Sequence, residues 1–375
     1  MNQTGPKSSF YFANLDGLRS IAFVSVFLWH ISTYMAYLPS PGVESILLKT
    51  ICSQGHLGVN LFFVLSGFLI SFLLMMEKEK QGRIQIVHFY FRRLLRIWPL
   101  YFVIAGLGLF CIPMLLHQFN PMQIREHGLS FLFFTNNFNR IHTGFVGIGN
   151  DSLGVLWSIA VEEQFYFFLP LLLALFNRKW FPWLFLFTIL VSLIFRWANI
   201  SDENVIYLHT LSVMSDLAIG AILAYLVCFK PGFVHYLKKL PQFAIISVYL
   251  LSLIFIFFFS YRINLPVYRL FERLVFSFFF AFIIAEQCYS DNSFFKFKNS
   301  KILCKMGLIT YGLYCLHLYS IMIVQKINSH FGVVHISTLL FYCELITCLI
   351  ISILLAKLSY TYFESYFLAL KKRFD

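Results

Sequence analysis

The sequence has little charge: 12% of its 375 residues are Asp, Glu, Lys or Arg, whereas 59% are hydrophobic. A soluble globular protein carries about 25% charged residues, so half of the usual solvating surface is missing here. This shortage argues against a soluble domain of this length. We therefore expect most of the chain to be surrounded by lipid.

Cysteine pairs and the common catalytic signatures are also missing. The eight cysteines are scattered, with no Cys-x-x-Cys pair and no Cys/His spacing suited to a metal ion. The chain has no glycine-rich phosphate loop, no Gly-x-Ser-x-Gly elbow and no apparent internal repeat. We therefore predict no disulfide framework, no metal site and no permanently bound cofactor.

Long apolar runs are what the sequence has instead. A transmembrane helix needs about 20 mainly apolar residues, and these runs do not show the period-two alternation of barrel strands. The sequence predicts an all-α polytopic membrane protein with about ten transmembrane helices. They are expected at 17–38, 56–76, 95–116, 153–176, 181–199, 205–229, 242–261, 268–289, 304–327 and 334–358.

The net charge of +12 is distributed as in a membrane protein rather than a nucleic-acid-binding protein. With a cytoplasmic N-terminus, most of the 29 Lys and Arg residues fall on the inner side of the ten spans, as the positive-inside rule requires. Both termini are then cytoplasmic, and residues 1–375 form one membrane-embedded domain. The first run carries Asp16, Arg19 and His30 and no cleavage site follows it, so we interpret it as a retained helix.

Two connections between the predicted spans are long. Residues 77–94 form a basic segment on the predicted cytoplasmic side, and residues 117–152 form the longest segment, on the outer side. Within the latter, the apolar stretch 129–134 is too short to span and is expected to be re-entrant or interfacial. Its amide and imidazole side chains suit contact with a carbohydrate, although they also suit a solvated loop.

The first predicted span carries ionisable residues, which cost about 2.5–3.5 kcal/mol each at a helix centre. His30 follows Arg19 by eleven residues, about three turns plus 20°, so both project from one face about 16 Å apart along the axis. A molecule with phosphates at one end and a reactive group at the other, such as acyl-CoA, fits this spacing. Imidazole suits proton transfer near neutral pH; the alternative is a hydrogen-bonded histidine between helices.

Three arginines lie close together where the third span leaves the cytoplasm. Arg93 and Arg96 share a helix face, and guanidinium groups bind phosphate bidentately. We predict that both bind phosphate. The alternative is anchoring of the helix end at the membrane interface with Trp98, and that alternative suits Arg92 best.

Two adjacent carboxylates, Glu162 and Glu163, enter the fourth span from the outer side. They point about 100° apart, so one can face the protein interior. An inward glutamate is expected to orient His30, to accept a sugar hydroxyl or to pair with Arg19. A purely structural ion pair is the alternative.

Two further segments combine small and polar residues. Residues 55–68 include Ser66 and Gly67, which predict either close helix packing or a narrow path for the pantetheine arm beside helix one. Residues 307–317 place Tyr311 near the inner end of the ninth span and His317 deeper. A packed polar patch would also explain the second segment.

Taken together, these segments resemble the acyltransferase-3 family of membrane acyltransferases. The resemblance covers nearly the whole chain, in the family's order. The residues on which the resemblance depends are Asp16-Gly17-Leu18-Arg19 through His30, Gly58 through Phe68, Tyr90 through Arg96 and Pro99, Trp157 through Tyr166, and Tyr311-Gly312 through His317. Thr310 and Cys315-Leu316 depart from the family's pattern, which makes a role for His317 less secure than one for His30.

The resemblance implies a ten-helix protein of the bacterial inner membrane that uses cytoplasmic acyl-CoA, commonly acetyl-CoA, as co-substrate. It implies transfer to an extracytoplasmic glycan such as O-antigen, capsule, exopolysaccharide or peptidoglycan. Because the chain ends at Asp375, without the family's fused hydrolase-like domain, we expect direct acylation or transfer to a separate extracytoplasmic partner.

The resulting hypothesis gives each residue a role. Arg19, Arg93 and Arg96 bind the phosphates, and His30 acts as general base or as a transient acyl carrier, with Glu162 or Glu163 orienting it. Supporting or cofactor contacts are expected from Asp16, Ser66, Gly67, Tyr90, Trp157, Tyr311 and His317.

Two other functions remain open at this point. A transporter or flippase of a lipid-linked sugar or small anion would use intramembrane Arg, Glu and His equally well, although the paired broken helices and repeats of transporters are not apparent. A structural subunit of a polysaccharide assembly complex would leave the alignment of Arg19 with His30 unexplained.

Overall fold

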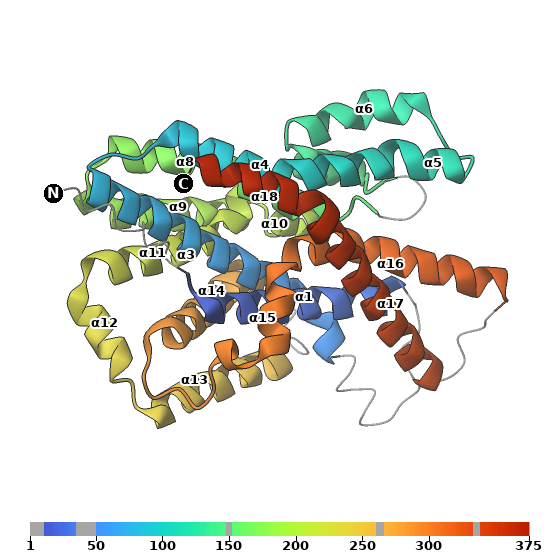
Figure 1. The fold of residues 1–375 in the computed structure, drawn as a ribbon. Coiled ribbons are helices and arrows are strands. Elements are labelled where there is room, and N and C mark those ends of the chain that lie inside the picture. The colour runs from blue at the N-terminus through green and yellow to red at the C-terminus, as the bar shows by residue number, and fades with distance from the viewer. Residues whose placement is uncertain (1–10, 35–49, 148–151, 260–265, 333–337, 375) are drawn as a thin grey trace.

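The computed structural model describes residues 11–34, 50–147, 152–259, 266–332 and 338–374, and within these ranges the regular elements are all helices (Figure 1). The all-α prediction is confirmed for this part of the chain. The helices are α1 (Ala13–Tyr34), α3 (His56–Gln81), α4 (Ile86–Gly106), α5 (Ile112–Leu115), α6 (Pro121–Leu132), α7 (Asn136–Thr143), α8 (Leu156–Leu175), α9 (Phe181–Ala198), α10 (Glu203–Leu208), α11 (Thr210–Phe229), α12 (Pro231–Lys238), α13 (Gln242–Ile254), α14 (Pro266–Tyr289), α15 (Lys301–Leu308), α16 (Thr310–His330), α17 (Thr338–Ser359) and α18 (Ser365–Lys371).

Short π or 3-10 turns continue or join several of these helices. They are η1 (Leu107–Cys111), η2 (Arg178–Trp180), η3 (Phe255–Phe259), η4 (Phe297–Asn299), η5 (Tyr360–Glu364) and η6 (Lys372–Phe374). Because η1 and η5 join α-helices without a loop, α4–α5 and α17–α18 each form one long, continuous helical stretch with a local distortion.

Six helical stretches within the described residues are long and apolar enough to cross a membrane. Two bent helix pairs raise the number to as many as eight. The prediction of a polytopic membrane protein is thus supported, while ten spans and cytoplasmic termini stay predictions. The six stretches are His56–Gln81, Ile86–Leu115, Leu156–Leu175, Arg178–Ala198, Glu203–Phe229 and Leu339–Phe374.

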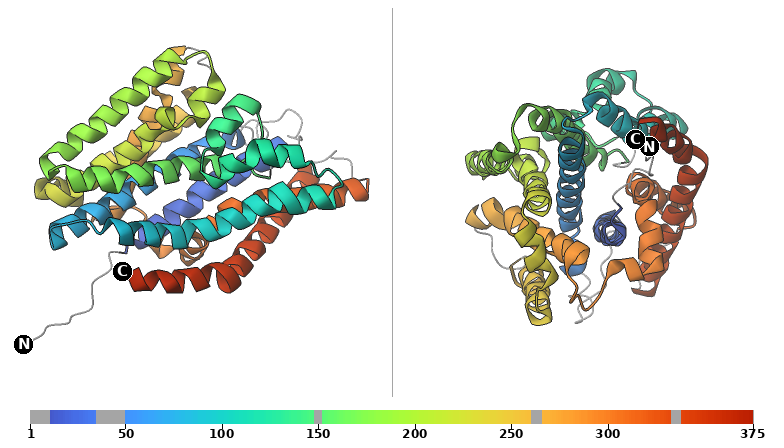
Figure 2. Two further views of the ribbon diagram at one scale, coloured as in Figure 1. Left: turned by 90° about the horizontal axis from the view of Figure 1, so that it is seen from above. Right: turned by 60° about the vertical axis from the view of Figure 1, so that its left-hand side comes forward.

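Helix α3 lies at the centre of the packing and contacts α1, α8, α11 and α14. Figure 2 shows α1 end-on, between α3 and the helices of the C-terminal third. The tightest crossing joins α3 to α11, since a Cβ on Gly67 would lie 2.0 Å from the Leu217 carbonyl oxygen and one on Gly220 would lie 2.2 Å from that of Val64. Small residues allow this close backbone approach between membrane helices, so the packing interpretation holds for Gly67.

The predicted span 304–327 is broken in the structure. Helices α15 and α16 meet at an angle of 81°. The bend coincides with a close contact of α15 on α1, because a Cβ on Gly307 would lie 2.2 Å from the carbonyl oxygen of Asp16. Hydropathy alone predicts one straight span here, whereas the structure bends next to the contact with α1.

Both predicted long connections contain more helix than expected. Helices α3 and α4 extend into the basic segment and leave only residues 82–85 between them. The segment 117–152 forms α6 and α7, with Asn120 capping α6 by accepting a hydrogen bond from the backbone N–H of Met122 at 2.9 Å. The apolar stretch 129–134 forms the end of α6, and its exposed Leu129, Leu132 and Phe133 are consistent with an interfacial position.

A buried ion pair outside the predicted motifs joins α11 to α14. Asp216, with no exposed surface, accepts hydrogen bonds from Arg273 Nη2 at 2.6 Å and Nε at 3.1 Å, and from Ser277 at 3.0 Å. Arg196 of α9, equally buried, donates to Ser215 beside this pair. A charge buried with several hydrogen-bond partners fixes the relative positions of the helices that carry them.

Replacing Asp216 by alanine is expected to destabilise the protein by about 3–5 kcal/mol, because it leaves the Arg273 guanidinium buried without its counter-ion. The thermal unfolding midpoint in detergent micelles measures this. The matched control is Glu203→Ala, which removes the more exposed pair of Glu203 with Arg269 and is expected to cost no more than about 1 kcal/mol. Equal midpoints for the two variants would contradict a structural role for Asp216.

Candidate active site

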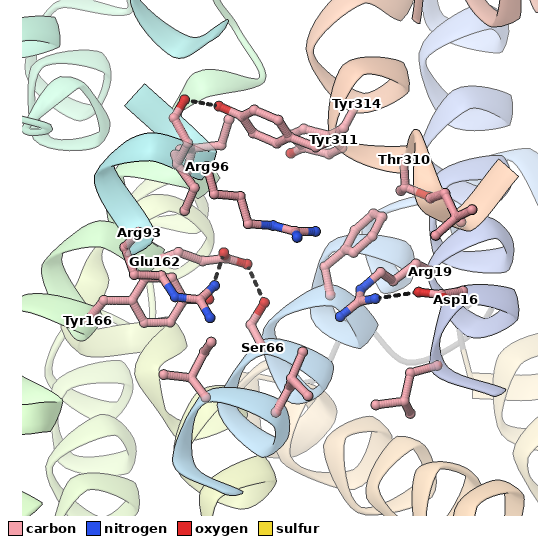
Figure 3. Close-up of a pocket in the computed structure, with 18 of the residues that line it drawn as sticks. Asp16, Arg19, Ser66, Arg93, Arg96, Glu162, Tyr166, Thr310, Tyr311 and Tyr314 are labelled. Atoms are coloured by element: carbon pink, nitrogen blue, oxygen red, sulfur yellow. Dashed lines mark hydrogen bonds and ion pairs between the residues drawn. The ribbon is translucent and has the colours of Figure 1, made fainter. Parts of the chain in front are cut away.

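A cavity of about 450 Å³ lies between α1, α3, α4, α8 and α16 and is bordered by α18. Most ligand pockets have volumes of about 300–1,000 Å³, so this one suits a small molecule or part of a larger one. Figure 3 shows its charged and aromatic side chains converging from separate helices. The polar and aromatic lining includes Asp16, Arg19, Ser66, Arg93, Arg96, Ser158, Glu162, Tyr166, Thr310, Tyr311, Tyr314, Glu364 and Lys371.

Arg19 enters the cavity from α1 and is held by its own helix. Its Nη1 lies 2.7 Å from Asp16 Oδ1, one turn earlier. The other carboxylate oxygen of Asp16 accepts a hydrogen bond from the Tyr11 hydroxyl at 2.6 Å. Asp16 therefore restrains the Arg19 guanidinium, and Arg19 retains further N–H donors to offer a ligand.

Arg93 and Arg96 enter from α4, on the same face as predicted. Figure 3 shows Arg96 extending from α4 into the space between it and Arg19, and Arg93 lying beside Tyr166 and Glu162. The Arg93 guanidinium lies 5.7 Å from the ring centroids of both Phe89 and Tyr166. In the described part of the chain neither arginine makes a salt bridge, and the buried Nε of Arg93 has no hydrogen-bond partner.

Glu162 is the glutamate that faces the cavity. Its two carboxylate oxygens accept hydrogen bonds from Ser66 of α3 and from Tyr166 of α8, each at 2.9 Å. Because Ser66 and Gly67 are consecutive, the first faces the cavity while the second packs on α11. Of the two residues expected to contact acyl-CoA, Ser66 therefore lines the cavity, whereas Gly67 does not.

Two tyrosines from α16 complete the wall. Tyr311 donates to the Ile97 carbonyl of α4 at 2.6 Å, and the Tyr314 hydroxyl lies 2.6 Å from that of Ser158. These bonds tie α16 to α4 and α8 across the cavity. The Tyr314 ring also lies near His317, outside the cavity, with the two ring centroids 6.0 Å apart.

His30 and His317 form a pair behind Tyr314. His30 Nδ1 lies 3.0 Å from His317 Nε2, across the interface of α1 and α16. Neither histidine is among the residues that line the cavity, whereas Tyr314 lines it and lies next to His317. The predicted separation of Arg19 from His30 is retained, because both lie on the continuous helix α1.

The remaining predicted residues lie elsewhere. Glu163 accepts a hydrogen bond from the Trp98 indole N–H at 2.9 Å and lines a second cavity of about 410 Å³ that Tyr90 also lines. Tyr90 donates to the Phe167 carbonyl at 2.6 Å. Trp157 is buried against Phe63 and Tyr207. Neither Glu163 nor Trp157 is among the residues that line the first cavity.

Sequence reasoning assigned no role to several lining residues, among them Tyr166, Tyr314, Glu364 and Lys371. The two tyrosines lie inside the motifs, and a packed polar patch was the alternative for the segment that contains Tyr314. Glu364 was overlooked, although a carboxylate in an apolar C-terminal segment is itself a signal. Its Oε1 accepts a hydrogen bond from Ser359 at 2.8 Å and lies against Gly312 of α16.

Apolar helices thus enclose a cavity that three arginines line. A family model described as an acyltransferase domain, Acyl_transf_3, matches residues 12–357. The match covers most of the chain, which therefore belongs to this family of acyltransferases.

Curated relatives come from Staphylococcus aureus. "Putative O-acetyltransferase SACOL0978" of strain COL is 27% identical over 374 residues, and "O-acetyltransferase OatA" of strain NCTC 8325 is 28% identical over 376 residues. Each alignment covers 95% of this chain but 57% of the relative. The chain thus spans little more than half the length of these relatives. No solved structure matches it.

Proposed function

We propose that this protein transfers an acyl group, most simply acetyl, from cytoplasmic acyl-CoA to a hydroxyl of an extracytoplasmic glycan such as O-antigen, capsule or exopolysaccharide. The observation that carries the proposal is the convergence of Arg19, Arg93 and Arg96 on one cavity. The three come from two helices far apart in the sequence, and family membership supplies the reaction class. The protein would act in the bacterial inner membrane.

The donor's phosphates account for the arginines. Salt bridges to guanidinium groups are strongest when the anion accepts two parallel hydrogen bonds, as phosphate does. Among the described residues Arg19 forms a salt bridge with Asp16, whereas the carboxylates that act on Arg93 and Arg96 lie beyond salt-bridge distance. The N–H donors of Arg93 and Arg96 would therefore be available to a bound nucleotide pyrophosphate.

The acyl end of the donor would then lie along α1. About 16 Å of helix separates Arg19 from His30, with Tyr314 between the cavity and the histidine pair. His30 would take the proton of the acceptor hydroxyl while the hydroxyl oxygen bonds to the thioester carbonyl carbon. The carbon–sulfur bond then breaks, and His30 gives the proton to the CoA thiolate.

The acceptor is proposed from the relatives and from the fold. Both relatives are named for O-acetyl transfer, which favours acetyl and a hydroxyl acceptor. Helices α6 and α7 lie in the segment expected on the outer side, where a glycan would approach. Because the chain spans 57% of these relatives, either direct acylation or transfer to a separate extracytoplasmic partner fits the proposal.

The purified protein in lipid nanodiscs is expected to release free CoA from acetyl-CoA only when an acceptor glycan is supplied. A thiol assay measures the release, and mass spectrometry of surface glycans from cells with and without the protein identifies the group and the acceptor. The expected mass difference is one acetyl unit per modified sugar. Sugar movement across the bilayer with no CoA release and no change in glycan mass would instead indicate a transporter and reject the proposal.

A further inference from the structure

The hydrogen bonds around His317 fix the position of its proton. Its Nδ1 lies 2.8 Å from the carbonyl oxygen of Tyr314 and 3.2 Å from that of Leu313. Carbonyl oxygens only accept hydrogen bonds, so Nδ1 has to be the nitrogen that carries the hydrogen. The helix backbone of α16 thus selects one tautomer of this ring.

His317 is held neutral by its surroundings. The side chain is fully buried, and its ring packs against those of Phe23 and Phe27, with centroids 5.8 Å and 6.4 Å away. Among the described residues no carboxylate forms a salt bridge with it. An imidazolium in an apolar site without a counter-ion is costly. With Nδ1 protonated and the ring neutral, His317 Nε2 is an acceptor.

The same reasoning then determines the tautomer of His30. His30 Nδ1 lies 3.0 Å from His317 Nε2, and two lone pairs at that distance would repel each other. His30 Nδ1 therefore has to be the donor of this hydrogen bond. In the neutral His30 ring the lone pair is left on Nε2.

We propose that His317 is a positioning residue that holds His30 in the Nδ1-protonated tautomer, so that His30 Nε2 is the nitrogen that reacts. The inference rests on the proposed function for its chemical consequence. It replaces the expectation that Glu162 or Glu163 orients His30, because Glu162 accepts from Ser66 and Tyr166 and Glu163 accepts from Trp98.

The pair also determines where the proton of the acceptor hydroxyl goes. When His30 Nε2 takes the acceptor's proton, the positive charge of the imidazolium is shared along the hydrogen bond from His30 Nδ1 to His317 Nε2. The hydroxyl oxygen bonds to the carbonyl carbon, the carbon–sulfur bond breaks, and the CoA thiolate takes the proton back from Nε2. If His30 instead carries the acyl group transiently, Nε2 bonds to the carbonyl carbon as the carbon–sulfur bond breaks. The acceptor oxygen then displaces Nε2 from that carbon, and the acceptor's proton passes to the CoA thiolate.

Replacing His317 by phenylalanine keeps a flat ring between Phe23 and Phe27 but removes the acceptor. His30 then loses the ring acceptor that favours its Nδ1-protonated tautomer. We expect kcat with acetyl-CoA and acceptor to fall by about 10²–10³-fold, in the range of a lost general base or a wrong histidine tautomer. KM for acetyl-CoA is expected to stay near the wild-type value because His317 does not line the arginine cavity.

His317→Gln provides the conservative comparison. Its amide oxygen can accept from His30 Nδ1, so we expect it to recover at least about ten-fold of the activity lost in His317→Phe, in line with one hydrogen bond. Equal kcat in the wild type and in a folded His317→Phe variant would overturn the proposal. So would equal loss in both variants with KM raised in parallel.

Nitrogen-15 NMR of histidine-labelled protein in nanodiscs reads the tautomer without any substrate. The His30 resonances, assigned by their loss in His30→Ala, are expected to show a protonated Nδ1 and an unprotonated Nε2 in the wild type. A wild-type His30 with a protonated Nε2 would overturn the inference, whatever happens to the His317 variants. The spectrum and the enzyme assay test different claims. An inactive wild type with the expected tautomer rejects the proposed function alone. An active wild type with the opposite tautomer rejects this inference alone.

Discussion

Replacing His30 by alanine is expected to abolish acylation, with a loss of at least about 10³-fold in kcat. General base catalysis alone contributes about 10²–10⁴-fold, and a nucleophilic role would make the loss complete. The variant should still reach the membrane, because the packing of α1 against α3 and α15 is unchanged. CoA release by purified protein, together with the quantity of protein in the membrane fraction, measures the effect.

His88→Ala is the matched control for this experiment. His88 lies on α4, its ring packs against Phe374, and it lines neither cavity. Its replacement is expected to leave kcat unchanged. Acylation retained in a well-folded His30→Ala variant would reject the assignment of His30 as the reacting group.

Replacing Arg93 by alanine is expected to weaken acetyl-CoA binding by about 10–100-fold and to change kcat much less. Hydrogen bonds to charged groups contribute about 1.5–3 kcal/mol, and each 1.4 kcal/mol corresponds to a factor of ten in affinity. Arg96→Ala should behave similarly, and Arg93→Lys should recover only part of the affinity because an ammonium cannot bind phosphate bidentately. The KM for acetyl-CoA and direct binding of CoA both measure the effect.

Arg92 offers a control one residue away. It pairs with Glu77 at 3.1 Å and donates to the Phe374 carbonyl at 2.7 Å, outside the cavity. Arg92→Ala is therefore expected to bind CoA normally. Acetyl-pantetheine, which lacks the nucleotide, sharpens the comparison, since Arg93→Ala should not reduce its turnover further. An Arg93→Ala variant with wild-type affinity for CoA would contradict the phosphate role.

The arginines could be placed from the sequence because each prediction depended on one helix. The spacing of Arg93 and Arg96 puts them on one face of α4, and apolar runs identify the helices that carry Arg19 and Glu162. Helix periodicity is a local property, and the structure brings these side chains to a common cavity. The all-helical class followed from the same runs.

Contacts between distant helices could not be predicted in this way. The bond between His30 and His317 joins residues 287 positions apart, and no periodicity reports on such a pair. The sequence also could not decide between Glu162 and Glu163, because the choice depends on the rotation of α8 against α3. The pair of Asp216 and Arg273 could not be predicted either, because no periodicity relates charges in the two predicted spans 205–229 and 268–289.

The broken span at Ile309 shows a further limit of reasoning from hydropathy. The run 304–327 is apolar enough to predict one helix, yet α15 and α16 meet at 81°. The bend follows Gly307, which packs so closely on α1 that an added Cβ would lie 2.2 Å from the Asp16 carbonyl oxygen. A bend of this kind brings Tyr311 and Tyr314 to face the arginines.

The crossing of α3 and α11 determines which side of the cavity has room to adjust. At Gly67 and Gly220 the two backbones already touch, and Ser66, the neighbour of Gly67, forms part of the cavity wall. That wall cannot retreat toward α11 without backbone overlap. A bulkier ligand in this cavity would therefore have to displace α16 or the C-terminal helix α18 rather than α3.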